Sequence, residues 1–259
     1  MKIALGVEYD GSRYHGWQKQ PHAPSVQAVL EAAVARVAAA PVSVVCAGRT
    51  DTGVHAQAQV VHFETAAERP DRAWLLGVNS HLPPDVALRW ARHVADDFHA
   101  RYAATARSYR YVILNRPTRP ALLARRVTWV HRPLDAARMH EAAQALRGEH
   151  DFSTYRALGC QARHPRRCIE SIAVTRDGEC LYLDVTANAF LHHMVRNIAG
   201  VLIAIGKGER PVTWAGELLA LRDRRQGGVT APPHGLYLVG VRYPARFGLP
   251  EPPPPVRYG

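Results

Sequence analysis

Long apolar runs are absent from this 259-residue sequence. A helix that crosses a bilayer needs about 20 consecutive apolar residues, and no stretch approaches that length. The first residues also lack the apolar core and the small-residue cleavage site of a signal peptide. Hydrophobic residues still make up 47% of the chain, as in a globular protein with a real core. These features predict a cytoplasmic protein that has no membrane partner.

Cysteine is scarce, and no two cysteines form a C-x-x-C pair. Paired cysteines at that spacing are the usual signature of a structural zinc site. We therefore expect free thiols in a reducing compartment and no zinc. The residues concerned are Cys46, Cys160, Cys168 and Cys180.

Lysine and acidic residues are few relative to arginine. Only Lys2, Lys19 and Lys207 are lysines, yet Lys plus Arg totals 33 against 22 for Asp plus Glu, which gives a net charge of +11. Such an excess favours a polyanionic partner, most often nucleic acid. Arginine binds phosphate and stacks on bases, although codon usage explains the ratio of Arg to Lys equally well. Codon usage does not explain the net charge.

Strand-like and helix-like patterns alternate in both halves of the chain. Ile3, Leu5 and Val7 alternate with smaller or polar residues, as in a strand. Ser25 and Asp135 each precede apolar residues at helical spacing and are expected to cap a helix. A strand over 109–114 and a long helix over 190–205, with apolar residues from Phe190 to Ile205, are predicted in the second half.

The strand–helix–strand order of both halves, without a long linker, predicts an α+β protein. We expect two subdomains on a largely antiparallel shared sheet, with a catalytic cleft between the halves. The predicted subdomains are residues 1–104 and 105–247. A proline-rich tail, 248–259, follows and is expected to lack a fixed fold.

The segment 48–53, Gly-Arg-Thr-Asp-Thr-Gly, stands out as a loop between two strands. Its glycines permit unusual backbone angles or close approach of a ligand. Arg49 and Asp51 are two apart and point the same way in an extended stretch, so Arg49 can hold Asp51 ionised, as a nucleophile requires. On spacing alone, a structural turn with a surface ion pair is the favoured interpretation.

Other polar and aromatic residues allow similar alternatives. Tyr109 begins an alternating strand, and core packing is its simplest interpretation. Arg196 and Asn197 can point together from one helix face into a cleft. A metal site from His192 and His193 is not expected, because adjacent residues of a helix do not converge. His55 can act as a general base, but a structural hydrogen bond is favoured.

Two arginine clusters are candidates for phosphate contacts, with a solvated basic face as the equal alternative. The clusters are Arg163, His164, Arg166 and Arg167, and Arg222, Arg224 and Arg225.

Several blocks together resemble one family, the TruA family of tRNA pseudouridine synthases. The resemblance covers nearly the whole chain, in the family's order. Its blocks are Tyr9-Asp10-Gly11 with Tyr14-His15-Gly16-Trp17-Gln18, the segment 48–56 around Asp51, Phe98-His99-Ala100-Arg101-Tyr102 with residues 104–111, residues 188–200, and Gly235-Leu236-Tyr237-Leu238.

The resemblance implies a pseudouridine-synthase-like fold and an enzyme that isomerises uridine to pseudouridine in the anticodon arm of tRNA, at positions 38, 39 and 40. It implies no cofactor, no metal, tRNA as partner and a homodimer. Asp51 is then the nucleophile, and Arg49 is its ion-pair partner and helps to fill the space left by the displaced base. Tyr109 stacks on the target uracil and is a candidate base for the C5 proton, and Arg196 lies near the catalytic carboxylate.

Two other functions remain as alternatives. A tRNA-binding or tRNA-folding protein would keep the scaffold without catalysis, but it would have no need for Asp51, Arg49 and Tyr109 together. A basic nucleotide hydrolase is disfavoured, because the sequence contains no P-loop and no metal triad.

Overall fold

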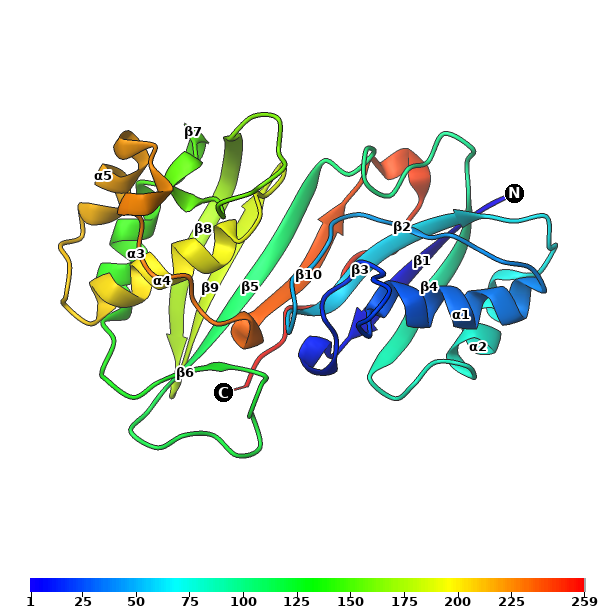
Figure 1. Cartoon of the computed structure of the whole chain (residues 1–259), viewed down its shortest axis with the longest axis horizontal. Helices are drawn as coiled ribbons and strands as arrows, with labels where there is room; N and C mark the ends of the chain where they lie inside the picture. The colour runs from blue at the N-terminus through cyan, green and yellow to red at the C-terminus, as the bar shows by residue number, and fades with distance from the viewer. Residues whose placement is uncertain (259) are drawn as a thin grey trace. The chain divides into compact units, whose positions relative to one another are not determined.

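Ten strands and five α-helices make up the computed structural model, which describes residues 1–258 (Figure 1). Contacts divide the chain into two units. The first unit is Met1–Ala106 with Tyr237–Pro255, and the second is Arg107–Leu236 together with the residues from 256 on. The division at Ala106 lies close to the predicted seam. Residues 237–255 instead join the first unit, because the strand that begins there pairs with a strand of that unit.

The strands of the first unit follow the order β4-β1-β3-β10. β1 is antiparallel to both β3 and β4, whereas β10 runs parallel to β3. α1 and α2 pack on each other and lie beside these strands (Figure 1). The elements are β1 Lys2–Tyr9, α1 Val26–Ala38, β2 Val45–Cys46, β3 His55–Glu64, α2 Asp71–Asn79, β4 Val86–Val94 and β10 Leu236–Arg242.

The strands of the second unit follow the order β5-β9-β8-β7, all antiparallel, with β6 parallel to β5. α3 packs on β8 and on α4. The elements are β5 Ala106–Asn115, β6 Thr128–Val130, α3 Ala136–Gln144, β7 Gly148–Asp151, β8 Arg166–Asp177, β9 Cys180–Ala187, α4 Met194–Gly206 and α5 Trp214–Leu221. Short 3-10 turns are η1 Gly11–Arg13, η2 Ser153–Tyr155, η3 Arg224–Gln226, η4 Pro233–Gly235 and η5 Ala245–Phe247.

Local sequence signals explain several of these boundaries. The Ser25 hydroxyl accepts a hydrogen bond from the Ala28 N–H, and the Asp135 carboxylate accepts one from the Arg138 N–H, as expected of N-caps. The long helix predicted from Phe190 was wrong at its start. α4 begins at Met194, because His193 adopts the left-handed conformation at φ 60°, which interrupts a right-handed helix.

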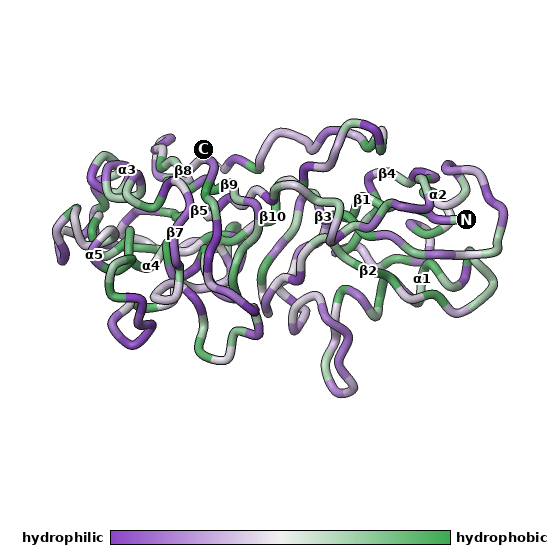
Figure 2. The backbone as a smooth tube through the Cα atoms, turned by 90° about the horizontal axis from the view of Figure 1, so that it is seen from above, coloured by the Kyte–Doolittle hydropathy of each residue, from purple (hydrophilic) through white to green (hydrophobic). Residues whose placement is uncertain are grey.

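The α+β class and the predominance of antiparallel pairing are confirmed. Within the units, as far as residues 1–258 go, only β3/β10 and β5/β6 are parallel. Figure 2 shows hydrophobic residues concentrated in the strands and along α4. In the same described part of the chain, no helix is long and apolar enough to cross a membrane. The shared sheet and the cleft between halves stay predictions.

The proline-rich tail differs from the expectation of no fixed fold. In the first unit, the Gln57 side-chain amide donates to the Pro254 carbonyl at 2.6 Å. A cavity of about 260 Å³ lies between the strands and the tail, with Gly6, Trp90, Val241 and Pro250 among its lining residues. Gly6 admits the Trp90 indole, since a Cβ at Gly6 would lie 2.2 Å from it. Proline also restricts the unfolded tail, so the tail loses less conformational entropy when it packs.

The core of the first unit can be tested with two leucines on neighbouring helices. Leu30 on α1 is fully buried, whereas Leu76 on α2 is 54% exposed. We expect Leu30→Ala to lower the free energy of unfolding by about 2–5 kcal/mol through lost burial and a residual cavity. Leu76→Ala should change it by about 0.5 kcal/mol or less. Equilibrium urea unfolding measures both, and equal losses would contradict this description of the core.

Candidate functional site

Asp51 lies in the loop between β2 and β3, and the residue before it is the loop's anchor. Thr50 is 7% exposed. Its hydroxyl forms a buried hydrogen bond of 2.8 Å with the Tyr9 hydroxyl, and its carbonyl accepts from the Trp17 N–H at 3.0 Å. Asp51 itself is half-buried, and its carbonyl accepts from the Val54 N–H at 3.1 Å. The Asp51 backbone is thus restrained on both sides.

The segment 10–17, which belongs to the first block of the resemblance, packs directly against this loop. Gly16 has φ +89°, and a Cβ there would lie 2.7 Å from the Thr50 carbonyl oxygen and 3.1 Å from the Asp51 carbonyl carbon. The Gly53 N–H donates to the Tyr14 carbonyl at 3.3 Å. Glycine at position 16 therefore meets two requirements, a left-handed backbone and close contact with the loop.

His55 has the structural role that the sequence favoured. Its ring is 2% exposed and stacks on Tyr237, with ring centroids 4.6 Å apart. Its Nδ1 lies 3.1 Å from the Gly11 backbone nitrogen and 3.2 Å from the Asp10 carboxylate. The Gly11 N–H and the Asp10 carboxylate thus converge on one ring nitrogen of His55.

Asp10 is the carboxylate most affected by this arrangement. The hydrogen bond from His55 holds the pKa of the Asp10 carboxyl well below its usual range, aided by the hydroxyl and backbone N–H of Ser12 and opposed by partial burial. Asp10 therefore remains ionised and caps the η1 turn, which begins the segment packed against the Asp51 loop.

Arg49 has an exposed side chain, and no ion pair of Arg49 occurs among residues 1–258. Its predicted pairing with Asp51 stays a prediction. The preceding carbonyl, of Gly48, accepts from the Gln59 side chain at 2.7 Å. All four cysteines are free, as expected. Burial raises the pKa of the Cys46 thiol to about 11, so Cys46 is an inert part of the core.

Tyr109 lies on β5 in the second unit and is 8% exposed. Its ring meets Phe190 edge to face, with ring centroids 5.0 Å apart. Tyr111, two residues on, is a core residue whose hydroxyl donates to the Pro232 carbonyl at 2.8 Å. On this strand, the Tyr109 ring therefore packs against an aromatic residue of the 188–200 block, whereas Tyr111 is held through its hydroxyl.

Arg196 lies in the first turn of α4, and its orientation is set by the segment 228–231. Its Nε donates to the Ala231 carbonyl at 2.9 Å, and the Ala231 N–H donates to the Arg196 carbonyl at 3.1 Å. The segment lies close to the helix because Gly200 has no side chain, since a Cβ there would lie 1.8 Å from the Val229 oxygen. Backbone contacts therefore fix the Arg196 guanidinium.

The expectation that Asn197 joins Arg196 in a cleft was wrong. Asn197 is 1% exposed, donates to the Tyr155 carbonyl and accepts from Thr230 and Arg224. The reason given against convergence of His192 and His193 was also wrong. Their rings lie 4.0 Å apart, because His193 precedes the helix in a left-handed conformation.

The two arginine clusters differ in their contacts. The Arg224 guanidinium donates hydrogen bonds to Gly228, Asn197 and Thr230, so it stabilises the second unit internally. Arg225 pairs with Asp223 at 2.8 Å. In the other cluster, Arg163 and Arg166 are exposed, and burial lowers the pKa of Arg167. Phosphate contact by the exposed members stays a prediction.

The structure thus assembles two sets of residues, each within its own unit. Asp51 lies with Tyr9, Thr50 and Gly16 in the first unit, and Tyr109 lies with Phe190 in the second. The sequence did not predict Tyr9, Thr50 and Phe190 as supporting residues. The available signal was the position of all three within the blocks of the resemblance, where Thr50 shares a block with Asp51 and Phe190 shares one with Arg196.

Comparisons with known proteins match this chain over most of its length. The model of a family described as tRNA pseudouridine synthase matches residues 6–103 and 142–244. A tRNA pseudouridine synthase A of Pseudomonas aeruginosa is 59% identical over 251 residues, covering 96% of this chain and 88% of the relative. A protein of the same name from Yersinia pestis is 58% identical over 253 residues, covering 98% of this chain and 96% of that protein.

The effect of Asp10 on stability can be tested through pH. Because its folded-state pKa is lowered from 3.8, the Asp10 carboxylate stabilises the fold above about pH 3.8, and this contribution is lost as the pH falls through the folded-state pKa. We expect Asp10→Asn to weaken the acid dependence of the unfolding free energy between about pH 4.5 and pH 2, measured with urea. The exposed Asp96→Asn should keep the wild-type slope. An unchanged slope in Asp10→Asn would contradict the assignment.

Proposed function

The chain belongs to the tRNA pseudouridine synthase family and isomerises uridine to pseudouridine in tRNA, and we propose that it acts in the anticodon arm, at positions 38, 39 and 40, with Asp51 as the nucleophile. The observation that carries the proposal is the restraint of the Asp51 backbone by Thr50 and by the turn to Val54. A nucleophile must be held within a fraction of an ångström of the reacting atom.

The reaction explains why a carboxylate is needed. The bond between N1 of uracil and the ribose must break, the ring must turn, and C5 must bond to the same ribose carbon. The C5 proton is then lost and N1 gains a proton, so no electrons are exchanged with a redox partner. A carboxylate can add to the base or to the sugar and keep the separated parts in place. Both routes need Asp51 in its ionised form.

Tyr109 is proposed to stack on the target uracil and to serve as the base for the C5 proton. Its ring is already held by the edge of Phe190 at 5.0 Å, which lowers the cost of ordering an aromatic ring around a base. Stacking of a base on an aromatic side chain contributes about 1–3 kcal/mol. That gain offsets part of the few kcal/mol required to extrude a base from its stack.

Arg49 and Arg196 complete the proposed site. The exposed Arg49 side chain is available to occupy the space left by the displaced base and to pair with Asp51 once RNA is bound. Arg196 is proposed to lie near the catalytic carboxylate. The support for it is the hydrogen bond to the Ala231 carbonyl, which holds its guanidinium in one direction.

The remaining proposals concern partners and setting. The net charge of +11 supports binding to tRNA through phosphate contacts, whose strength falls steeply with salt. We further propose a homodimer, a cytoplasmic location and a reaction that needs neither metal nor cofactor, in line with an internal rearrangement of one nucleotide.

The nucleophile is tested by Asp51→Asn, which keeps the shape of the side chain but removes its charge. We expect pseudouridine formation to be abolished and tRNA affinity to change little, because the affinity rests on basic residues elsewhere. Conversion in purified tRNA and filter binding measure the two quantities. The exposed Asp96→Asn serves as control. Substantial conversion by Asp51→Asn would show that Asp51 is not the nucleophile.

The support of the Asp51 loop is tested by two glycines. Gly16 and Gly178 both have positive φ, of +89° and +54°, but a Cβ meets the Asp51 loop only at Gly16, and nothing lies within 4 Å at Gly178. Alanine at either site should cost about 1 kcal/mol of stability for the backbone conformation. Only Gly16→Ala should also lower kcat, by about 100-fold, through displacement of the loop. Equal activities of the two variants would exclude this role.

A further inference from the structure

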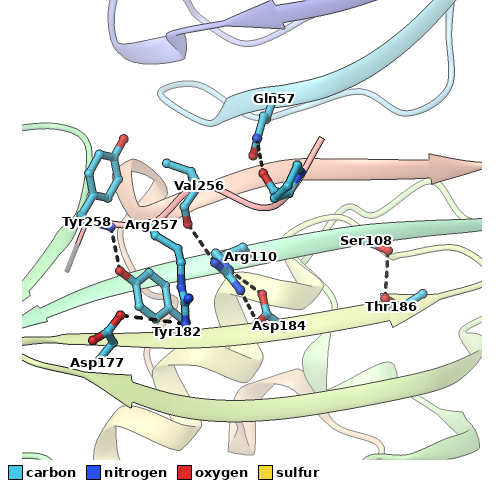
Figure 3. Close-up of polar contacts among 11 residues, drawn as sticks. Gln57, Ser108, Arg110, Asp177, Tyr182, Asp184, Thr186, Val256, Arg257 and Tyr258 are labelled. Atoms are coloured by element: carbon cyan, nitrogen blue, oxygen red, sulfur yellow. Dashed lines mark hydrogen bonds and ion pairs between the residues drawn. The ribbon is translucent and has the colours of Figure 1, made fainter. Parts of the chain in front are cut away.

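The strand that carries Tyr109 has a second face, on which Ser108 and Arg110 lie. Side chains alternate along a strand, so Arg110 points away from the face on which Tyr109 meets Phe190. Residues 256–258, called the clamp segment below, lie over this second face in front of β5 and β9 (Figure 3). All of these residues belong to the second unit.

Arg110 is the centre of the contacts on this face, although it is only 9% exposed. Its Nε and one terminal nitrogen donate to the two oxygens of Asp184 on β9, at 2.7 and 2.8 Å. Its guanidinium lies 4.7 Å from the centroid of the Tyr182 ring. The other terminal nitrogen donates to the Val256 carbonyl at 2.9 Å. A buried guanidinium needs acceptors on every side, and the clamp segment supplies one beyond the two oxygens of Asp184.

The clamp segment is held mainly by its backbone. The Tyr258 N–H donates to the Tyr182 hydroxyl at 2.8 Å, and the Tyr258 carbonyl accepts from the Cys180 thiol at 3.5 Å. The side chain of Arg257, in contrast, is 69% exposed and reaches Asp177 only at 3.9 Å. Such an exposed pair contributes little. The identity of the side chains at 256–258 should therefore matter less than the presence of their backbone groups.

We propose that the clamp segment, acting through Arg110, is a positioning element for Tyr109 in pseudouridine formation. Arg110 is the direct neighbour of Tyr109 on β5, and Tyr109 and Arg110 pair with Val185 and Asp184 of β9. The Val256 carbonyl holds the Arg110 side chain on the face of β5 opposite the Tyr109 ring. This contact therefore restrains the β5 backbone beside Tyr109. A displacement of about 1 Å at a reacting group can lower a rate by about 100-fold.

The inference rests on the proposed role of Tyr109. It is tested by removing, from either side, the hydrogen bond between Arg110 and the Val256 carbonyl, called the link below. One variant ends after Pro255. The other is Arg110→Lys, which retains a positive charge beside Asp184 but lacks the planar fork that also reaches Val256. We expect each to lower kcat by about tenfold, the size expected for one lost hydrogen bond of a charged group. KM for tRNA and the dissociation constant should stay within about twofold.

The combination of the two changes separates positioning from general loss of structure. If both break the same link, the double variant has the kcat of either single variant, because no link is left to lose. Independent structural damage would multiply the two losses. Should the shortened chain fail to fold, Tyr258→Pro and Tyr258→Ala replace it in the full chain, since only proline removes the N–H that binds Tyr182. The proline variant alone should then lose activity.

Two control variants change side chains near the link but leave the hydrogen bond between Arg110 and Val256 intact. Ser108 lies on the same face as Arg110 and bonds to the Thr186 hydroxyl at 2.8 Å (Figure 3), so Ser108→Ala should keep the wild-type kcat. Arg257→Ala should do so as well, because it keeps the backbone of the clamp segment. The inference is overturned if the shortened chain keeps full kcat, or if the losses in the double variant multiply. Failure of the wild-type protein to form pseudouridine would instead refute the proposed function.

Discussion

The buried hydrogen bond between the hydroxyls of Tyr9 and Thr50 is the interaction on which the first unit's site depends. It joins the last residue of β1 to the residue before Asp51. In a buried environment such a pair is costly to break, because each hydroxyl would be left without a partner. The backbone of Thr50 is held in turn by Trp17, and Gly16 lets residues 10–17 approach the loop. The position of Asp51 therefore follows from packing around Thr50.

In the second unit, the predicted site residues are held in position by different interactions. Tyr109 sits within a regular strand, and its neighbours on either face restrain it: Phe190 on one side, and Arg110 with Asp184 on the other. Arg196 is oriented by backbone pairing with Ala231. Arginine thus serves two purposes here. Arg110 and Arg224 stabilise the second unit from within, while phosphate contact by exposed arginines such as Arg163 stays a prediction.

Features set by nearby residues could be predicted from the sequence. Ser25 and Asp135 cap their helices because each cap needs only the three residues that follow it. The start of α4 and the order in the proline-rich tail could not be predicted in this way. The former depends on the left-handed conformation of His193. The latter depends on partners far away in the sequence, since Gln57 and Pro254 are 197 positions apart, and Arg110 and Val256 are 146 apart.

The same distinction applies to the site. Spacing alone favoured a structural turn at Asp51, and only the resemblance of several blocks indicated a nucleophile. The Tyr9–Thr50 pair that restrains the loop spans 41 positions and leaves no local pattern. We propose that this chain forms pseudouridine in the anticodon arm. Mapping of pseudouridine in tRNA from cells with and without the gene tests it most directly. Without the gene, we expect loss of pseudouridine at positions 38, 39 and 40 alone, and persistence of pseudouridine at these positions would contradict the proposed function.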